Sequence, residues 1–226
     1  MGRDNQPKNR QRLFLERKEG RRKPYDRLLI VCEGKKTEPN YFKEICRFHR
    51  LSSANVCVVA SKYGTESLQV VDYAHNYCCE HNKWEKVFCV FDEDDHPNFS
   101  EAISRANEKC RKLKNDQGEE IEFYAIPSSP CFELWLLLHF EELTTEISGR
   151  DLLKRLKKHM PKYEKSNGEH FANTKARLAT AYKNVVRLSG NRSGDKIRNP
   201  FTAIGEVVTA LMQLAKQSEE SIPHIA

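Results

Sequence analysis

Hydrophobic runs of strand length alternate with amphipathic segments through the first half of the chain. The apolar runs lie at residues 27–32, 55–60, 86–92 and 121–126. The intervening segments, at about 37–50, 65–79 and 100–114, space their apolar residues as one face of a helix. Repeated strand-helix steps predict an α/β fold with a wound, mainly parallel sheet flanked by helices.

The pattern changes after residue 126. Pro127-Ser128-Ser129-Pro130 predicts a break, and the strongly apolar segment 131–140 that follows predicts a helix with a single acid, Glu133. Further helices are predicted at 149–160, 173–189 and 201–216, and no strand signal of comparable strength appears there. We therefore expect an α/β core at residues 25–127 and a C-terminal helical layer at 128–226 packed on it.

The amino end is strongly basic. The chain has 226 residues and a formal net charge of +6, and residues 1–24 are rich in Lys and Arg with little apolar material to bury. This composition predicts a flexible basic arm whose first expected partner is nucleic acid, contacted by Arg21, Arg22 and Lys23. The alternative is a solvated tail that aids solubility.

The remaining composition favours a cytoplasmic protein that is not membrane-bound. No apolar run approaches the roughly 18 residues that a membrane-spanning helix needs, and the amino end lacks the apolar core of a signal peptide. The eight cysteines indicate reduced core residues rather than disulfides. A zinc site of Cys78, Cys79 and His81 is disfavoured because adjacent cysteines on a helix point to different faces.

Acidic residues follow two of the predicted strands. Glu33 comes directly after the first strand, and Asp92 and Asp94 come at the end of the third. Because ligands bind at the carboxyl ends of parallel strands, these acids are expected to converge on one pocket. Crowded carboxylates need a cation between them, and oxygen ligands suit Mg²⁺ or Mn²⁺. The sequence thus predicts a metal-dependent enzyme that acts on phosphates, unless these are ordinary loops with surface acids.

The loop after the first strand is not a nucleotide-binding P-loop. Leu29 stands where that motif needs glycine, and Lys36 stands where it needs Ser or Thr. Gly34 is expected to let the backbone approach a metal closely. Lys35 and Lys36 remain candidates for contacts with nucleic acid.

Four other side chains could act at the same site. Glu133 is a candidate catalytic acid, since a charge in so apolar a helix needs a partner; its alternative is a half-exposed position at a helix start. Lys165 could reach a phosphate, although a solvated loop is the commoner explanation. His96 and His139 could donate protons, and for His139 a core position is the stronger interpretation.

Three segments of the chain resemble the RloB-like family: CEGKKTEPNYF at 32–42, SPCFELWLLLHF at 129–140 and NPFT at 199–202. Glu33 with Asp92 and Asp94 is also similar to the TOPRIM catalytic core of topoisomerases and bacterial primases. The resemblance implies a TOPRIM-like fold, a role in prokaryotic defence and an ATPase partner. It also implies metal ligation by Glu33, Asp92 and Asp94, with Glu38 as a further ligand.

The expected function is therefore a Mg²⁺- or Mn²⁺-dependent endonuclease that hydrolyses DNA or RNA during antiviral defence. Its catalytic residues would be Glu33, Asp92, Asp94 and Glu133. Strand passage is set aside because it needs a tyrosine nucleophile domain and a longer chain. The alternative function is a non-catalytic adaptor that binds nucleic acid and docks on an ATPase.

Overall fold

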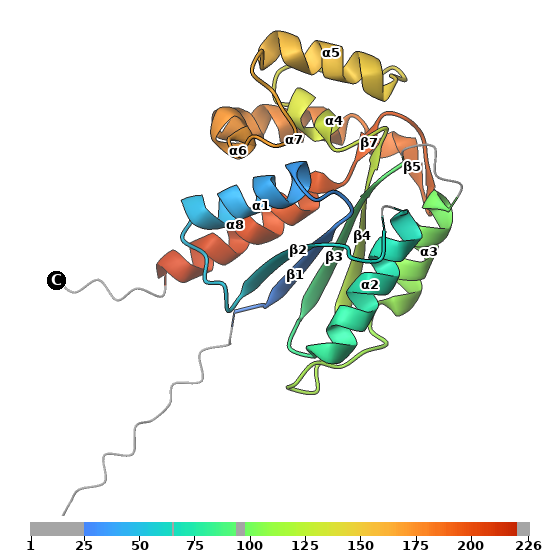
Figure 1. Ribbon diagram of the computed structural model, residues 1–226, viewed down its shortest axis with the longest axis vertical. Helices are drawn as coiled ribbons and strands as arrows, with labels where there is room; N and C mark the ends of the chain where they lie inside the picture. The colour runs from blue at the N-terminus through green and yellow to red at the C-terminus, as the bar shows by residue number, and fades with distance from the viewer. Residues whose placement is uncertain (1–24, 65, 94–97, 221–226) are drawn as a thin grey trace, which may run out of the picture.

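The computed structural model describes residues 25–64, 66–93 and 98–220. Its centre is a five-stranded sheet of order β2-β1-β3-β4-β7 (Figure 1). Neighbouring strands among the first four are parallel, and β7 is antiparallel to β4. The expected wound, mainly parallel sheet is thus confirmed. Its strands are β1 (Leu28–Cys32), β2 (Val56–Ala60), β3 (Lys86–Asp92), β4 (Glu122–Ser129) and β7 (Phe201–Thr202).

Helices cover both faces of this sheet (Figure 1). One face carries α2 (Ser67–Glu80) and α3 (Phe99–Lys109), and the other carries α1 (Thr37–Phe48) and α8 (Ile204–Glu220). Side chains of β1 alternate between the two layers: Leu29 and Val31 pack on the α2 side, whereas the residues before and after each pack on the α1 side. Because both faces are buried, the strand is apolar at every position.

The helices between β4 and β7 lie beyond the carboxyl end of the sheet (Figure 1). They are α4 (Glu133–Leu137), α5 (Gly149–His159), α6 (His170–Thr174) and α7 (Leu178–Val186), with a 3₁₀ turn at Lys175–Arg177. Their apolar side chains join the core on the α1 side of the sheet, and Trp135 Nε1 on α4 donates to the Tyr41 hydroxyl on α1 at 2.8 Å. The helical part and the sheet therefore share one core, and β4 runs across the expected boundary at residue 127.

Two predictions at the end of β4 are wrong. The segment 127–129 does not break the chain but continues β4, where Pro127 and Ser128 pair with Phe91 and Asp92. Phe201 does not begin a helix, because it lies in β7 opposite Ser129. Pairing on both sides of β4 overrides the local Pro and Ser signals. A short hairpin of β5 (Arg192–Ser193) and β6 (Lys196–Ile197) was also not predicted.

Several helices differ from their predicted bounds. The first begins at Thr37 as expected but ends at Phe48, before the predicted residue 50. The predicted helix at 131–140 is only five residues long, and Asn184 Nδ2 donates to the carbonyls of Leu138 (2.9 Å) and Glu141 (3.1 Å) beyond its end. The predicted helix at 173–189 is divided between α6, the 3₁₀ turn and α7. Side-chain capping and tertiary contacts set these ends.

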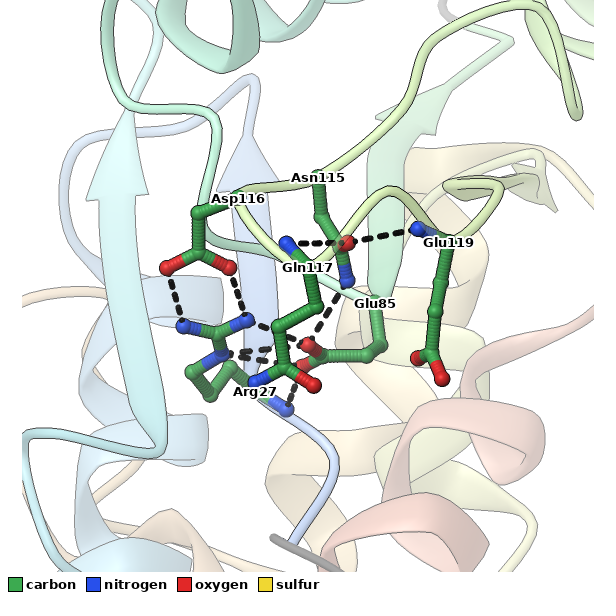
Figure 2. Close-up of polar contacts among 6 residues, drawn as sticks. All are labelled: Arg27, Glu85, Asn115, Asp116, Gln117 and Glu119. Carbon is green, nitrogen blue, oxygen red and sulfur yellow. Dashed lines mark hydrogen bonds and ion pairs between the residues drawn. The ribbon is translucent and has the colours of Figure 1, made fainter.

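An ionic cluster closes the amino end of the sheet, opposite the acidic loops (Figure 2). Arg27 precedes β1, and its guanidinium bonds Glu85, which precedes β3, and Asp116 in the loop before β4. Asn115 Nδ2 donates to Glu85 at 2.9 Å, and its Oδ1 accepts from the backbone of Gln117 and Glu119. Arg27 therefore ties together the starts of three parallel strands.

Candidate active site

Glu33 and Asp92 meet at the carboxyl ends of two neighbouring strands. The backbone N–H of Glu33 donates to Val90 O at 2.9 Å, which extends the β1–β3 pairing by one residue. The N–H of Asp92 donates to Glu33 Oε2 at 3.0 Å. Both side chains are buried. The structure thus brings these two acids together as the strand pattern predicts.

Glu38 adds a third carboxylate from the first turn of α1. Its carboxylate lies against Gly34, where a Cβ atom would overlap it. Any other residue at position 34 would therefore displace the Glu38 carboxylate from its present position. Burial raises the pKa of Glu38, and the negative charge of Glu133 raises it further, while backbone hydrogen bonds and Lys165 act in the opposite direction.

Glu133 supplies a fourth carboxylate at the start of α4. Its side chain is only 2 % exposed, so the alternative of a half-exposed helix-start acid is wrong. The Tyr163 hydroxyl donates to Glu133 Oε1 at 2.7 Å, and Lys165 Nζ lies 3.4 Å from the same oxygen. The charge of Glu133 is the main cause that raises the pKa of Lys165. Lys165 therefore contacts an acid of the site directly.

Asp92 is buried close to the charges of the other three acids. The residue is 8 % exposed, and its Oδ1 atom has no hydrogen-bond partner among the residues that the structure describes. Burial raises the pKa of Asp92 well above its usual value, and the charges of Glu38, Glu133 and Glu33 raise it further. A backbone hydrogen bond with Phe132 opposes this shift. Four acids from three separate chain segments thus repel one another in one buried region.

The donor chemistry of this group suits a hard divalent cation, because every candidate ligand atom is a carboxylate oxygen. Within the described residues, however, no three His, Cys, Asp or Glu side chains are already arranged to hold one metal ion. Binding would have to draw the carboxylates of Glu33, Glu38, Asp92 and Glu133 closer together. A bound cation would supply an interaction partner for Asp92 Oδ1, which is buried without a hydrogen-bond partner among the described residues.

Some expected site residues lie outside the described ranges. They are Arg21, Arg22, Lys23, Asp94 and His96. Lys35 and Lys36 are described and exposed, in the loop between Glu33 and α1. They remain accessible to a ligand at this edge of the sheet.

His139 is a core residue, which is the interpretation that the sequence favoured. It is fully buried, and its Nδ1 lies 2.8 Å from the Trp135 carbonyl oxygen. Burial lowers the pKa of His139 to about 4, so the side chain is neutral at physiological pH. Its Nε2 atom is buried without a hydrogen-bond partner among the described residues.

Sequence reasoning missed two parts of this region. Tyr163, the hydroxyl partner of Glu133, stands in a polar loop with no pattern that signals a buried position. The second part is a cavity of about 530 Å³ that opens beside Glu133 and Lys165 and is bounded by α5. The recurrence of Arg150, Lys154 and Lys157 at helical spacing is a signal that could have indicated its basic wall.

The sequence of this chain matches the model of a known protein family. The family model described as RloB-like protein matches residues 28–211. This chain belongs to the RloB-like family. The matched range spans every strand and helix of the RloB-like fold described above up to the last part of α8. No curated protein and no solved structure matched the chain.

Two further observations concern the cysteines and the helices of the chain. All eight cysteines have free thiols. Among the described residues, the structure has no helix with the length and apolar character to cross a bilayer.

Proposed function

We propose that this chain is a Mg²⁺- or Mn²⁺-dependent endonuclease that hydrolyses phosphodiester bonds of DNA or RNA. One observation carries the proposal: Asp92 is buried with an unpartnered carboxylate oxygen, at the carboxyl edge of a parallel sheet, among three other acids. Retaining four mutually repelling carboxylates in a core costs stability, and a cation is the partner that offsets this cost. Ligands of parallel α/β folds bind at this edge.

The side chains divide into two roles. Asp92, Glu33 and Glu38 would hold the cation, with Asp94 as a further ligand, and Glu133 would act at the reacting phosphate. A bound Mg²⁺ or Mn²⁺ supplies charge stabilisation and an activated water for phosphodiester hydrolysis. Lys165, which lies 3.4 Å from Glu133 Oε1, would neutralise charge on a phosphate. Tyr163 holds the Glu133 carboxylate in one orientation.

Membership of the RloB-like family supports a proposal about the cellular role and the partner of this chain. We infer a cytoplasmic TOPRIM-type nuclease in antiviral defence, acting by abortive infection with an ATPase partner. The basic residues at 1–24, including Arg21, Arg22 and Lys23, would raise affinity for the nucleic acid, as would Lys35 and Lys36. An ATPase partner would give a means of restraining the nuclease until infection.

The test is cleavage by the purified full-length chain. We expect cleavage of plasmid DNA, single-stranded DNA or total RNA in Mn²⁺ or Mg²⁺, no cleavage in EDTA, and none with Asp92→Asn. The control variant is Glu146→Gln, which neutralises an exposed acid that belongs neither to the group of four acids nor to the cavity lining. Nucleic-acid binding that is equal in EDTA and Mn²⁺, without cleavage and without measurable Mn²⁺ affinity, would instead establish the adaptor function.

A further inference from the structure

The cavity beside Glu133 has a strongly basic wall. Its lining includes Arg150, Lys154 and Lys157 from α5 and Lys165 from the following loop, with Glu133 as its single acid. Figure 1 shows α5 as the outermost helix above α4, at the carboxyl end of the sheet. The cavity thus reaches Glu133, one of the four acids, from the side of α5.

Helical spacing explains why these cations share one face of α5. Arg150, Lys154 and Lys157 follow an i, i+4, i+7 pattern, which places them in one row. Leu152 and Leu156 are fully buried on the nearly opposite side of the helix, so the row of cations faces away from the core and is exposed. The row spans about 10 Å along the helix axis, from the rise of about 1.5 Å per residue. Burial of the leucines therefore fixes the direction in which the three cations point.

The charge on this wall is only partly compensated within the protein. Lys154 Nζ lies 2.9 Å from the Asp151 carboxylate, in an exposed pair. The side chains of Arg150 and Lys157 form no hydrogen bond or ion pair with any residue that the structure describes. By contrast, Arg155 on another face of the same helix bonds Glu141 at 2.7 Å. The positive charge is thus left available on the face that lines the cavity.

The recessed acids restrict what can use this wall. All four acids are buried: Glu33, Glu38, Asp92 and Glu133. A scissile phosphate would therefore have to enter the protein below its surface to contact them. A cavity of about 530 Å³ has the size of a small-ligand site and accommodates roughly one or two nucleotides. A duplex, whose major groove alone is about 12 Å wide, does not fit into a space of this size. An unpaired strand can enter it while its flanking phosphates contact α5.

We propose that the α5 wall, formed by Arg150, Lys154 and Lys157, binds the phosphate backbone of an unpaired nucleic-acid strand and delivers it to the acidic group. This inference rests on the proposed nuclease function for its biological meaning. It adds the substrate class, a single strand, and the residues that hold it. Lys165 lines the same cavity and lies 3.4 Å from Glu133 Oε1, so a strand bound in the cavity would also meet Lys165.

The first experiment measures binding in EDTA, where no cleavage is expected. Fluorescence anisotropy of the full-length chain would use labelled oligothymidylate and oligouridylate of equal length over a range of salt concentrations. Changing Arg150, Lys154 and Lys157 together to Gln should weaken binding by at least about tenfold at low salt. It should also reduce the slope of log K against log salt by about 2, because each phosphate contact on a single strand contributes about 0.7.

The matched control is Lys158→Gln. Lys158 is an exposed residue in the same last turn as Lys157, but it does not line the cavity. Its affinity and salt slope should equal those of the wild type. A triple variant that binds like the wild type, or a Lys158→Gln variant that loses as much affinity as Lys157→Gln, overturns the proposal.

A second measurement locates the strand independently of the basic residues at 1–24. Photocross-linking with 4-thiouridine RNA or 5-iodouridine DNA, followed by peptide mapping, should label the segment 149–165. An unlabelled duplex of the same length should compete poorly for this label. Cross-links confined to other segments, or equal competition by the duplex, contradict the proposal. Absence of cleavage by a wild type that still cross-links on α5 would count against the nuclease function alone.

Discussion

The backbone N–H of Asp92 donates a hydrogen bond to Glu33 Oε2 at 3.0 Å, which joins the carboxyl ends of two neighbouring parallel strands. This bond orients the Glu33 carboxylate toward β3. The Asp92 carboxylate has its own backbone partner in Phe132, yet one of its oxygens remains without any in the described residues. The two acids therefore differ: Glu33 is held by the sheet, whereas Asp92 still lacks a partner for one buried oxygen.

Asp92→Asn should weaken metal binding and stabilise the metal-free protein. The substitution replaces a carboxyl group whose ionisation is opposed by burial and by three neighbouring acids, so the melting temperature in EDTA at neutral pH should rise by a few degrees. In the same variant, the affinity for Mn²⁺ should fall by at least about tenfold. Differential scanning calorimetry and isothermal titration calorimetry measure these two quantities.

Glu146→Gln is the control for this change, because it removes one exposed negative charge from the same chain. It should alter neither the Mn²⁺ affinity nor the melting temperature appreciably. If Asp92→Asn binds Mn²⁺ as tightly as the wild type, Asp92 is not a ligand. A large loss of stability in EDTA would show instead that its charged form supports the fold.

Tyr163→Phe should reduce cleavage without abolishing it. The phenol donates a 2.7 Å hydrogen bond to Glu133, and its loss leaves that carboxylate less well oriented. Outer-shell partners of this kind typically contribute about 10–100-fold in activity or metal affinity. The fall should appear in kcat more than in KM, because Tyr163 is a positioning residue. A change in KM alone would indicate that Tyr163 contacts the substrate.

The strand pattern was sufficient to predict the convergence of Glu33 and Asp92. Both acids follow apolar runs, and a parallel sheet aligns the ends of such runs at one edge. The sequence also correctly indicated Glu133 as a buried acid, because so apolar a helix leaves a charge little room to reach water.

The contacts from distant segments could not be predicted in the same way. Tyr163 reaches Glu133 only because the loop after α5 folds back across the start of α4. Likewise, Glu44 on α1 accepts hydrogen bonds from the backbone N–H groups of His170, Phe171 and Ala172 at the start of α6. No local pattern encodes such pairs, because they depend on which loop packs on which helix.

Replacement of His139 by Met should flatten the dependence of stability on pH in the acidic range. The folded-state pKa of His139 is about 4, whereas the unfolded-state value is about 6.5. Between these values the unfolded chain binds a proton that the native state does not, so the wild type loses stability as the pH falls below 6.5. One such group contributes at most about 1.4 kcal/mol per pH unit.

Urea denaturation at several pH values between 4.5 and 7 would measure this slope in both proteins. Burial also lowers the pKa values of His49 and His170, but these residues are unchanged in the variant. The difference between the two slopes therefore isolates His139. Identical slopes would mean that His139 titrates alike in the folded and unfolded states.

Arg27→Met should destabilise the fold without affecting the acidic group directly. The change leaves Glu85, whose side chain is 15 % exposed, without its guanidinium partner (Figure 2). Loss of a partner for a largely buried polar group costs about 1–3 kcal/mol. Arg105→Met is the control, because its pair with Asp72 is more exposed and should contribute little. Equal urea midpoints for the two variants would contradict a structural role for the Arg27 cluster.

Glu133→Gln distinguishes most sharply between a catalytic and a structural acid. Gln keeps the shape of the side chain and can still accept the Tyr163 hydrogen bond through its carbonyl oxygen, but it loses the negative charge. If Glu133 acts at the reacting phosphate, kcat should fall by at least about a hundredfold.

The stability of this variant supplies the necessary control. Removing a charge that repels Asp92 and Glu38 should compensate in part for the lost contact with Lys165, so the melting temperature should change by only a few degrees. Near-normal cleavage by a folded Glu133→Gln protein would falsify the catalytic assignment. It would also leave the Tyr163 hydrogen bond as a purely structural contact, in which case Tyr163→Phe should lower stability and spare kcat.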